Sequence, residues 1–258
     1  MNYFSPKSAA ERYAKGRPAF HHLIVDRIKE ILSLTEPLAR ALDVGCGTGL
    51  STVALTDIAR EIVGADISPE MLSFARKEEG ISYVVCAGER LALASGAFDL
   101  ITVSQALHWF ERDAFLREAR RVLRAGGWLV AYDNYFEGES KETNYFQRWH
   151  REVYHAKYPI PPRGAVSLTD EDAARGGFHL FHQELQQHAV RFSLEALIDY
   201  LVSQSNVIAA VEGGGEEIEE VRRWMRATLA SYFGKASEAD FLFNAPIWFL
   251  QRADTSEN

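Results

Sequence analysis

Hydrophobic positions between residues 39 and 134 follow two alternating patterns. Short apolar runs, several of them rich in β-branched residues, occupy 41–44, 61–66, 81–85, 98–103 and 128–132. Between these runs, apolar residues recur at the three- and four-residue spacing typical of amphipathic helices, over 52–59, 69–79 and 113–124. Strands separated by helices of this length predict right-handed crossovers and a parallel sheet.

The sequence contains a clear signal for the start of one helix. Ser68 is a residue type that caps helices, and Pro69 fits the first helical position, where its missing N–H costs nothing. Gly80 is expected to end this helix, because glycine is common just after the last helical residue. The sequence therefore predicts a helix over 69–79.

The flanking segments are less regular. Residues 8–15, 20–34, 194–202 and 216–232 have helical patterns, and 183–191 and 241–250 read as strands. Residues 135–181 are aromatic-rich and break the strand–helix rhythm. We expect one α/β domain over 1–258, with a doubly wound, mostly parallel sheet and helices on both of its faces. Its parts are expected to be a helical N-terminal segment (1–38), a βα core (39–134), an insertion that forms a lid (135–181) and completing strands and helices (182–252).

Composition narrows the functional classes. Acidic residues outnumber basic ones by 36 to 28, which gives a net charge of −8 and argues against nucleic acid or an anionic membrane as partner. No stretch approaches the 18 apolar residues of a membrane span, and the N-terminus lacks the apolar core of a signal peptide. We therefore expect a cytoplasmic protein. The two cysteines, Cys46 and Cys86, make neither a disulfide framework nor a zinc site, and no metal is expected. The sequence does not fix the oligomeric state.

The chemistry-bearing segment is the turn after the first strand of the core. Glycine stands at 45, 47 and 49, and glycine there permits positive φ and close approach of a ligand to the backbone. Asp66 ends the next strand, 21 residues after Gly45, where an acid can accept hydrogen bonds from a ribose diol. A dinucleotide site would place its third glycine at position 50, which is Leu50.

The G-x-G-x-G form behind Asp43 instead resembles the S-adenosylmethionine site of Rossmann-like, class I methyltransferases. Residues 66–72 look like the second-strand acidic motif of these enzymes, and 87–91 resemble their loop after the third strand. The segment 104–110 (SQALHWF) is similar to the trans-aconitate methyltransferase-like branch, as are 11–18 and 199–207. The resemblance implies the Rossmann-like fold and an enzyme that uses S-adenosylmethionine and releases S-adenosylhomocysteine.

The same resemblance implies a set of cofactor residues. Asp43 would lie near the amino-acid moiety, Asp66 would bind the ribose, and backbone groups around 87–89 would meet the adenine. Arg17 could bind the cofactor carboxylate, and Gln105 could pack near the methionine end. The full set is Tyr13, Arg17, Asp43, Gly45, Cys46, Gly47, Gly49, Asp66, Ile67, Met71, Ala87, Gly88, Glu89, Ser104 and Gln105.

The acceptor side is less specific. We expect a small-molecule acceptor, with a carboxylate oxygen as one candidate, bound near His108, Trp109, Asn134, Tyr135 and Trp149. A carboxylate is already deprotonated at pH 7, so His108 would orient it or be a packing residue. With a phenol as acceptor, His108 could be a general base.

Three other functions stay open at this point. A non-enzymatic protein that binds S-adenosylmethionine or S-adenosylhomocysteine would carry the same turn. A nicotinamide-dependent oxidoreductase is disfavoured by Leu50 and by the lack of a Tyr-x-x-x-Lys pair near the fourth or fifth strand. A nucleic-acid methyltransferase is disfavoured by the net charge and by the absence of an Asn/Asp-Pro-Pro-Tyr/Phe motif.

Overall fold

A computed structural model describes residues 4, 6–140, 145–162, 164, 167–234 and 236–253. The chain forms two compact units. The first, here called the helical unit, comprises Met1–Pro18, Asn134–Pro162 and Gln186–Ala245; the second, the sheet unit, comprises Ala19–Asp133, Arg163–Leu185 and Pro246–Asn258. The long strands β7 (Phe178–Ser193) and β8 (Glu238–Arg252) each contribute residues to both units. The single domain expected over 1–258 stays a prediction.

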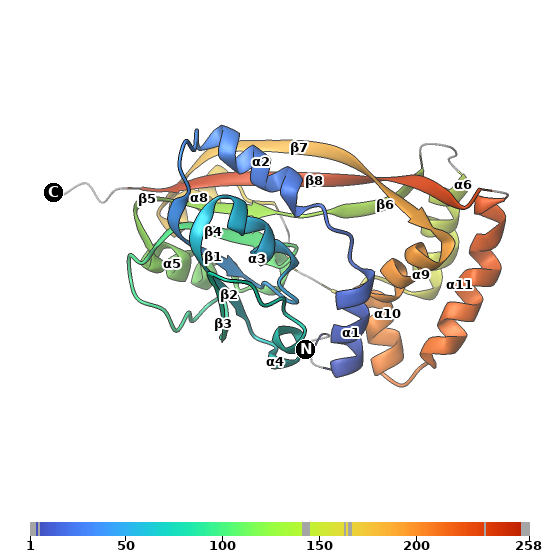
Figure 1. The fold of residues 1–258 in the computed structure, drawn as a ribbon. Helices are drawn as coiled ribbons and strands as arrows, with labels where there is room; N and C mark the ends of the chain where they lie inside the picture. The colour runs from blue at the N-terminus through green and yellow to red at the C-terminus, as the bar shows by residue number, and fades with distance from the viewer. Residues whose placement is uncertain are drawn as a thin grey trace. The chain divides into compact units, whose positions relative to one another are not determined.

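The sheet unit contains the predicted parallel strands. They are β1 (Leu38–Val44), β2 (Ala59–Asp66), β3 (Ile81–Val85), β4 (Phe98–Ser104) and β5 (Leu123–Tyr132). Their spatial order is β3-β2-β1-β4-β5, all neighbours are parallel, and β8 pairs antiparallel with β5 (Figure 1). The mostly parallel, Rossmann-like α/β sheet predicted from the sequence is confirmed.

The strand order fixes where a ligand is expected. The chain runs outward from β1 to β2 and β3, and then returns to the other side of β1 as β4. Between β1 and β4 the crossovers therefore leave in opposite directions, and open α/β sheets bind ligands in the crevice beyond the carboxyl ends of such strands. The segments that begin there are the glycine turn after Val44 and the loop after Ser104.

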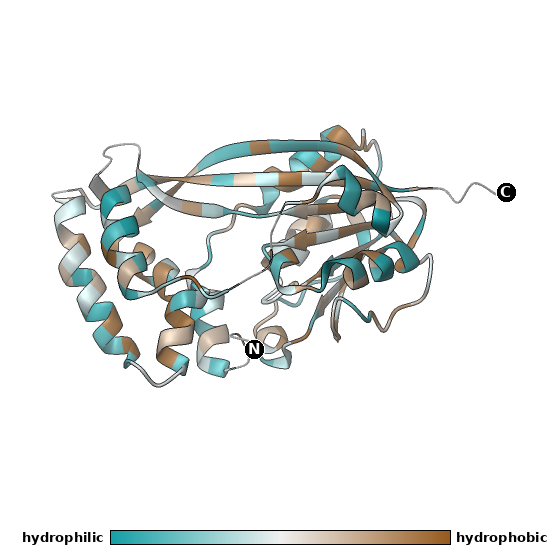
Figure 2. Ribbon diagram, turned by 180° about the vertical axis from the view of Figure 1, so that it is seen from behind, coloured by the Kyte–Doolittle hydropathy of each residue, from teal (hydrophilic) through white to brown (hydrophobic). Residues whose placement is uncertain are grey.

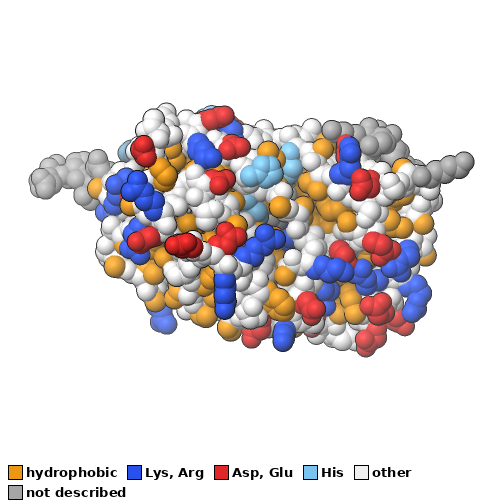
Figure 3. Space-filling model, viewed as in Figure 1, with side chains coloured by type: hydrophobic (Ala, Val, Ile, Leu, Met, Phe, Trp, Pro, Cys, Tyr) orange, Lys and Arg blue, Asp and Glu red, His pale blue; other side chains and the backbone are white. Residues whose placement is uncertain are grey.

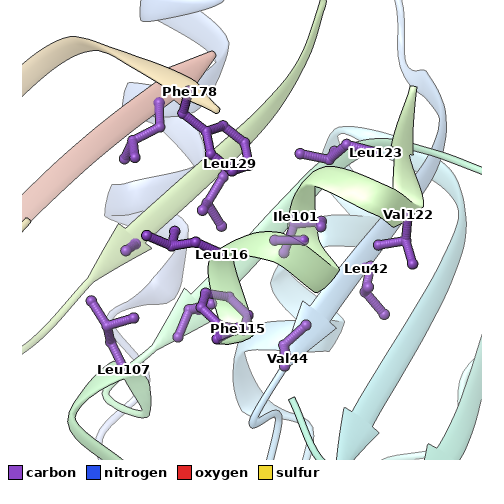
Figure 4. Packing of buried hydrophobic residues seen from close by; sticks show 14 of the residues in the cluster. Leu42, Val44, Ile101, Leu107, Phe115, Leu116, Val122, Leu123, Leu129 and Phe178 are labelled. Atoms are coloured by element: carbon purple, nitrogen blue, oxygen red, sulfur yellow. The ribbon is translucent and has the colours of Figure 1, made fainter. Parts of the chain in front are cut away.

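Alternate strand residues face two different helical layers. Leu42, Ile101 and Leu129 join a buried cluster with Phe115 and Leu116 of α5 (Arg112–Val122), and Ala173 of α8 (Asp170–Gly176) lies in the same cluster. Figure 4 shows these side chains of β1, β4, β5 and α5 gathered together. On the opposite face, Asp43 and Tyr132 meet α3 (Leu50–Ala54) and α2 (His21–Ile31) through hydrogen bonds. The period-2 alternation of the strands thus places helices on both faces.

The helix predicted over 69–79 is wrong in its second half. Ser68 caps it as expected, since its hydroxyl accepts the N–H of Met71 at 3.2 Å and Pro69 takes the first position. The helix α4 nevertheless ends at Ser73 (Pro69–Ser73). Residues 76–79 are Arg, Lys, Glu and Glu, so a continued helix would have no apolar side chain to bury there, and packing supplies most helical stability in proteins.

The helical unit is built around a second buried cluster. Its elements are α1 (Lys7–Gly16), β6 (Tyr135–Ser140), α6 (Tyr145–Trp149), the π-helical turn η3 (His150–Tyr154), α7 (His155–Lys157), α9 (Leu194–Val202), α10 (Ser205–Glu212) and α11 (Ile218–Phe233). In α11, Val221, Met225 and Leu229 are spaced four apart and fully buried, while hydrophilic residues lie between them (Figure 2). The remaining short helices, η1 (Leu55–Asp57) and η2 (Leu107–Trp109), belong to the sheet unit.

Charged side chains of both signs stand beside one another on the face shown in Figure 3. Ion pairs among the described residues include Arg226 with Glu195 at 2.6 Å. Among the residues that the structure describes, no helix is both long enough and apolar enough to span a membrane.

Candidate functional site

The glycine turn after β1 has the backbone that the sequence predicts. Gly45, Gly47 and Gly49 have φ of 71°, 54° and 77°, all in the left-handed region. The N–H groups of Gly45 and Cys46 donate to the carbonyl of Ala65 at 2.8 and 3.1 Å, which anchors the turn to β2. A Cβ on Gly45 would lie 2.4 Å from the Cβ of Ala106, so the turn also touches the loop after β4 too closely for any side chain.

Asp66 connects the turn to the end of β2. Its carboxylate accepts the backbone N–H of Gly47 and the backbone N–H of Ser68, each at 2.8 Å. Burial raises the pKa of Asp66, and hydrogen bonds from the backbone of Ser68, Gly47 and Ile67 act against that rise. Each carboxylate oxygen retains a second lone pair, so a ribose diol can still donate to it.

Asp43 has a different environment. It is fully buried, and its oxygens accept hydrogen bonds from the hydroxyls of Ser51 (2.6 Å), Thr52 (2.7 Å) and Thr102 (3.0 Å). Burial raises its pKa to about 6 despite these donors. The carboxylate therefore ties the start of α3 to β4 and fixes the glycine turn between them. Its contact with a cofactor stays a prediction.

Two buried hydroxyls at this edge make no hydrogen bond to any residue that the structure describes. They are Thr48 Oγ1 in the glycine turn and Ser104 Oγ at the end of β4, in residues that are only 3% and 8% exposed. Buried polar groups in proteins are almost always satisfied, so an orphaned hydroxyl calls for a ligand or an ordered water. Both lie at the β1–β4 switch point, which fits a polar cofactor bound in this turn.

The loop after β3 closes the turn from another side. A Cβ on the buried Gly88 would lie 3.2 Å from both Val44 and the Phe110 ring, so only a small residue fits there. The Glu89 carboxylate accepts the backbone N–H of Glu111 at 2.8 Å, which joins this loop to the segment before α5. Ile67 next to Asp66 is 60% exposed, so its side chain is accessible to a ligand at this edge.

Beyond β4 the backbone is strained. Gln105 has φ of 52°, which is uncommon for a residue other than glycine, and its N–H donates to the Tyr132 carbonyl at 2.9 Å. Three residues later, in η2, the buried His108 brings its Nδ1 to 3.7 Å from Oδ2 of Asp133, which directly follows β5. Strained backbone and a buried His–Asp pair thus occur together at the edge where a ligand is expected.

Comparison with known proteins bears on this geometry. The profile of the methyltransferase domain matches residues 42–131, from β1 through most of β5. A protein of Dictyostelium discoideum that is named as a methyltransferase is 27% identical over 250 residues, covering 94% of this chain and 92% of its own. The malonyl-[acyl-carrier protein] O-methyltransferase of Enterobacter lignolyticus is 32% identical over 132 residues, 48% of this chain and 52% of its own.

The chain is an S-adenosylmethionine-dependent methyltransferase. Its fold is shared with a solved structure from Anaeromyxobacter dehalogenans described as a type II methyltransferase, with a TM-score of 0.68, 20% identity, and coverage of 93% of this chain and 99% of the other. The reaction class and the Rossmann-like, class I character predicted from the sequence are therefore confirmed.

The remaining predicted site residues of this methyltransferase are divided between the sheet unit and the helical unit. In the sheet unit, Met71 and Cys46 are buried, and burial raises the pKa of the Cys46 thiol, so it is a packing residue and not a thiolate nucleophile. Ala87 lies half-buried before Gly88, and the Trp109 ring lies 4.7 Å from that of His108. The cofactor and pocket roles of these residues stay predictions.

Five predicted residues belong to the helical unit: Tyr13, Arg17, Asn134, Tyr135 and Trp149. The Arg17 guanidinium stacks over the rings of Tyr13 and Tyr200, at 4.5 and 5.5 Å, and donates to the Ser203 carbonyl at 3.1 Å. Trp149 is buried in the second hydrophobic cluster. Their roles toward cofactor and acceptor, and the lid role of 135–181, remain predictions.

The sequence did not single out two residues at this edge of the sheet, Thr48 and Asp133. Thr48 carries no distinctive pattern. Asp133 could have been found, because an acid directly after the fifth parallel strand lies at the same edge as His108. Within the described residues, no group of three or more His, Cys, Asp or Glu side chains could hold a metal ion.

Proposed function

We propose that this methyltransferase moves the methyl group of S-adenosylmethionine in line to an oxygen of a small-molecule acceptor. The proposal is carried by the groups that meet at this edge of the sheet. The glycine turn brings the Asp66 carboxylate and the Thr48 hydroxyl, which has no hydrogen-bond partner among the described residues, and the buried His108–Asp133 pair follows β4 and β5. The turn with Thr48 and Asp66 suits a nucleoside cofactor. The pair suits an oxygen acceptor, because it offers a polar group that can orient one.

The cofactor residues follow from the turn. Asp66 would hold the ribose, Gly45, Gly47 and Gly49 would let the amino-acid part approach the backbone, and backbone groups of 87–89 would meet the adenine. When bound, S-adenosylmethionine supplies a methyl group on a cationic sulfonium, which leaves as a neutral thioether. The protein's main task is then to hold nucleophile, carbon and sulfur in line and to exclude water.

Carboxylates are the first acceptors to test. The segment 104–110 resembles the trans-aconitate methyltransferase-like branch, and we propose that the chain belongs with it. The name of the Enterobacter relative gives malonyl-[acyl-carrier protein] as the molecule methylated on oxygen, and a malonyl thioester ends in a free carboxylate. A carboxylate is already ionised near pH 7, so its methylation needs no base. A cytoplasmic location remains part of this proposal.

The test is an acceptor screen with isotopically labelled methyl groups. Purified protein and S-adenosyl-[methyl-³H]methionine are incubated with small mono-, di- and tricarboxylic acids and a malonyl thioester, with Asp66→Ala as the binding-deficient control. We expect label in a methyl ester that mild alkali releases as methanol. Label only on nitrogen or carbon, or no transfer from a protein that binds the cofactor, would contradict oxygen methylation.

A further inference from the structure

The imidazole of His108 and the carboxylate of Asp133 form a buried pair inside the sheet unit. Nδ1 of His108 lies 3.7 Å from Oδ2 of Asp133, and both side chains are 6% exposed. Nδ1 makes no hydrogen bond within the described part of the chain, so the carboxylate is the group that this nitrogen faces. The separation is within ion-pair range and somewhat longer than a hydrogen bond, as is common at sites without substrate.

Further contacts involve the backbone and the ring of His108. The His108 carbonyl accepts the N–H of Gly164 at 3.0 Å, and Trp109 packs beside the imidazole at 4.7 Å. The 3₁₀ turn that carries His108 follows the strained Gln105, whose N–H is bound to the last residue of β5. His108 and Asp133 are thus both anchored to the ends of the neighbouring parallel strands β4 and β5.

A buried carboxylate next to Nδ1 selects the ring tautomer. It favours a proton on Nδ1, where the N–H can point at the negative oxygen, and leaves the lone pair on Nε2. Carboxylate acceptors make no use of such a lone pair. An acceptor that must lose a proton does, since a positioned base removes it as the new bond forms.

We propose that the His108–Asp133 pair gives this methyltransferase a second class of acceptor, the acidic hydroxyl of a phenol or an enol. The inference rests on the proposed oxygen methylation. The hydroxyl proton moves to Nε2 of His108, an oxygen lone pair forms the new O–CH₃ bond, and the C–S electron pair stays on the departing thioether. His108 becomes an imidazolium, which Asp133 stabilises. His108 is then a catalytic residue, and Asp133 is a positioning residue that acts through it.

The first test measures which ring nitrogen of His108 carries the proton, and it needs no acceptor. Long-range ¹H–¹⁵N NMR of the full chain, at a pH high enough for neutral imidazoles, reports the tautomer of His108. We expect the Nδ1–H form in the wild type and a shift toward Nε2–H in Asp133→Leu, with Asp133→Asn intermediate because its amide oxygen can still accept. Glu184→Gln is the matched control, since it alters the His182–Glu184 contact of 3.1 Å elsewhere in the sheet unit. An Nε2–H form in the wild type, or no change in Asp133→Leu, overturns the proposal.

The second test separates the acceptor classes. Labelled methyl transfer is measured for matched pairs of small phenols, enols and carboxylic acids. For hydroxyl acceptors we expect His108→Gln to lower kcat on the order of 100-fold, the typical contribution of a general base, and Asp133→Leu to lower it by a smaller factor. Turnover of carboxylates falls far less in both variants. Methylation of carboxylates without any methylation of hydroxyls overturns this inference and leaves the proposed function standing. If the wild type methylates no oxygen acceptor although it binds the cofactor, the proposed function fails and the hydroxyl activity fails with it.

Discussion

The carboxylate of Asp66 accepts the backbone N–H of Gly47 at 2.8 Å. The acid at the end of β2 therefore shapes the glycine turn after β1 before any ligand arrives. One residue would then serve two purposes, because the oxygens that hold the turn also have lone pairs left for a ribose diol. Loss of this carboxylate should consequently affect both the turn and the cofactor.

For Asp66→Ala we expect cofactor binding to weaken by about 1–3 kcal/mol, since hydrogen bonds to a charged acceptor are lost. Asp66→Asn retains one acceptor oxygen and should lose less. Isothermal titration with S-adenosylhomocysteine measures both. Asp57→Ala, at an exposed acid in η1, is the matched control and should bind like the parent. Equal affinity of Asp66→Ala and the parent would disprove the ribose assignment.

The steric demand at Gly45 can be separated from its backbone conformation. Gly45 and Gly96 have similar φ, 71° and 66°, but an added Cβ meets Ala106 at 2.4 Å in the first case and nothing within 4 Å in the second. Gly96→Ala should therefore cost about 1 kcal/mol of unfolding free energy, the usual penalty of a left-handed residue. Gly45→Ala should cost clearly more and abolish binding of S-adenosylhomocysteine. Chemical denaturation and titration give the two values, and similar losses in the two variants would show that no clash exists.

The hydroxyl of Thr102 supports a carboxylate with a raised pKa. Because burial places the pKa of Asp43 at about 6, the acid is ionised at pH 8 and protonated at pH 5. In Thr102→Val the bond of 3.0 Å to Asp43 is lost. Hydrogen bonds to charged groups contribute about 1.5–3 kcal/mol and those to neutral groups about 0.5–1.5 kcal/mol. The destabilisation by Thr102→Val should therefore be larger at pH 8 than at pH 5. Equal destabilisation at the two pH values would contradict the raised pKa.

His21 should make the fold sensitive to acid. Its Nδ1 lies 3.0 Å from the Tyr132 hydroxyl in a fully buried position, and burial, helped by the neighbouring His22, lowers its pKa from 6.5 to about 3. Between these two values the unfolded chain binds the extra proton, so the free energy of unfolding falls as pH falls from 6.5 toward 3. This amounts to about 2 kcal/mol between pH 7.5 and 5.

His21→Gln keeps a partner for Tyr132 and removes the titrating group. Urea denaturation at pH 7.5 and 5 should therefore show a smaller acid loss in the variant than in the parent, by roughly the same 2 kcal/mol. An identical acid loss in both proteins would mean that His21 is charged in the folded state.

The sequence predicted well those features that depend on neighbours along the chain. The glycine turn, the Ser68 cap and the parallel strands follow from local residue types and periodicity, and the structure has all of them. The early end of α4 at Ser73 could also be argued locally, from the polar run 76–79, once packing is weighed against capping.

Features that depend on the order of strands in space were out of reach. Asp43 owes its three hydroxyl partners to α3 and to β4, which lies 59 residues away at Thr102. The sequence could place His108 and Asp133 at the same edge of the sheet, but their contact depends on β4 and β5 being neighbours in it. The aromatic segment 135–181 shows no regular hydrophobic period. Its residues Trp149 and Tyr154 are buried among residues of α9–α11, which come much later in the chain.

The most direct test of the account is a parallel titration of the purified protein with S-adenosylmethionine, S-adenosylhomocysteine and NADH. A thermal-shift scan at about 100 times Kd supports it, since such a ligand adds about 2.7 kcal/mol to the free energy of unfolding. We predict that the first two ligands bind and stabilise the wild type, that Asp66→Ala weakens both, and that NADH does neither. Binding of NADH alone would contradict the assignment of the glycine turn to S-adenosylmethionine.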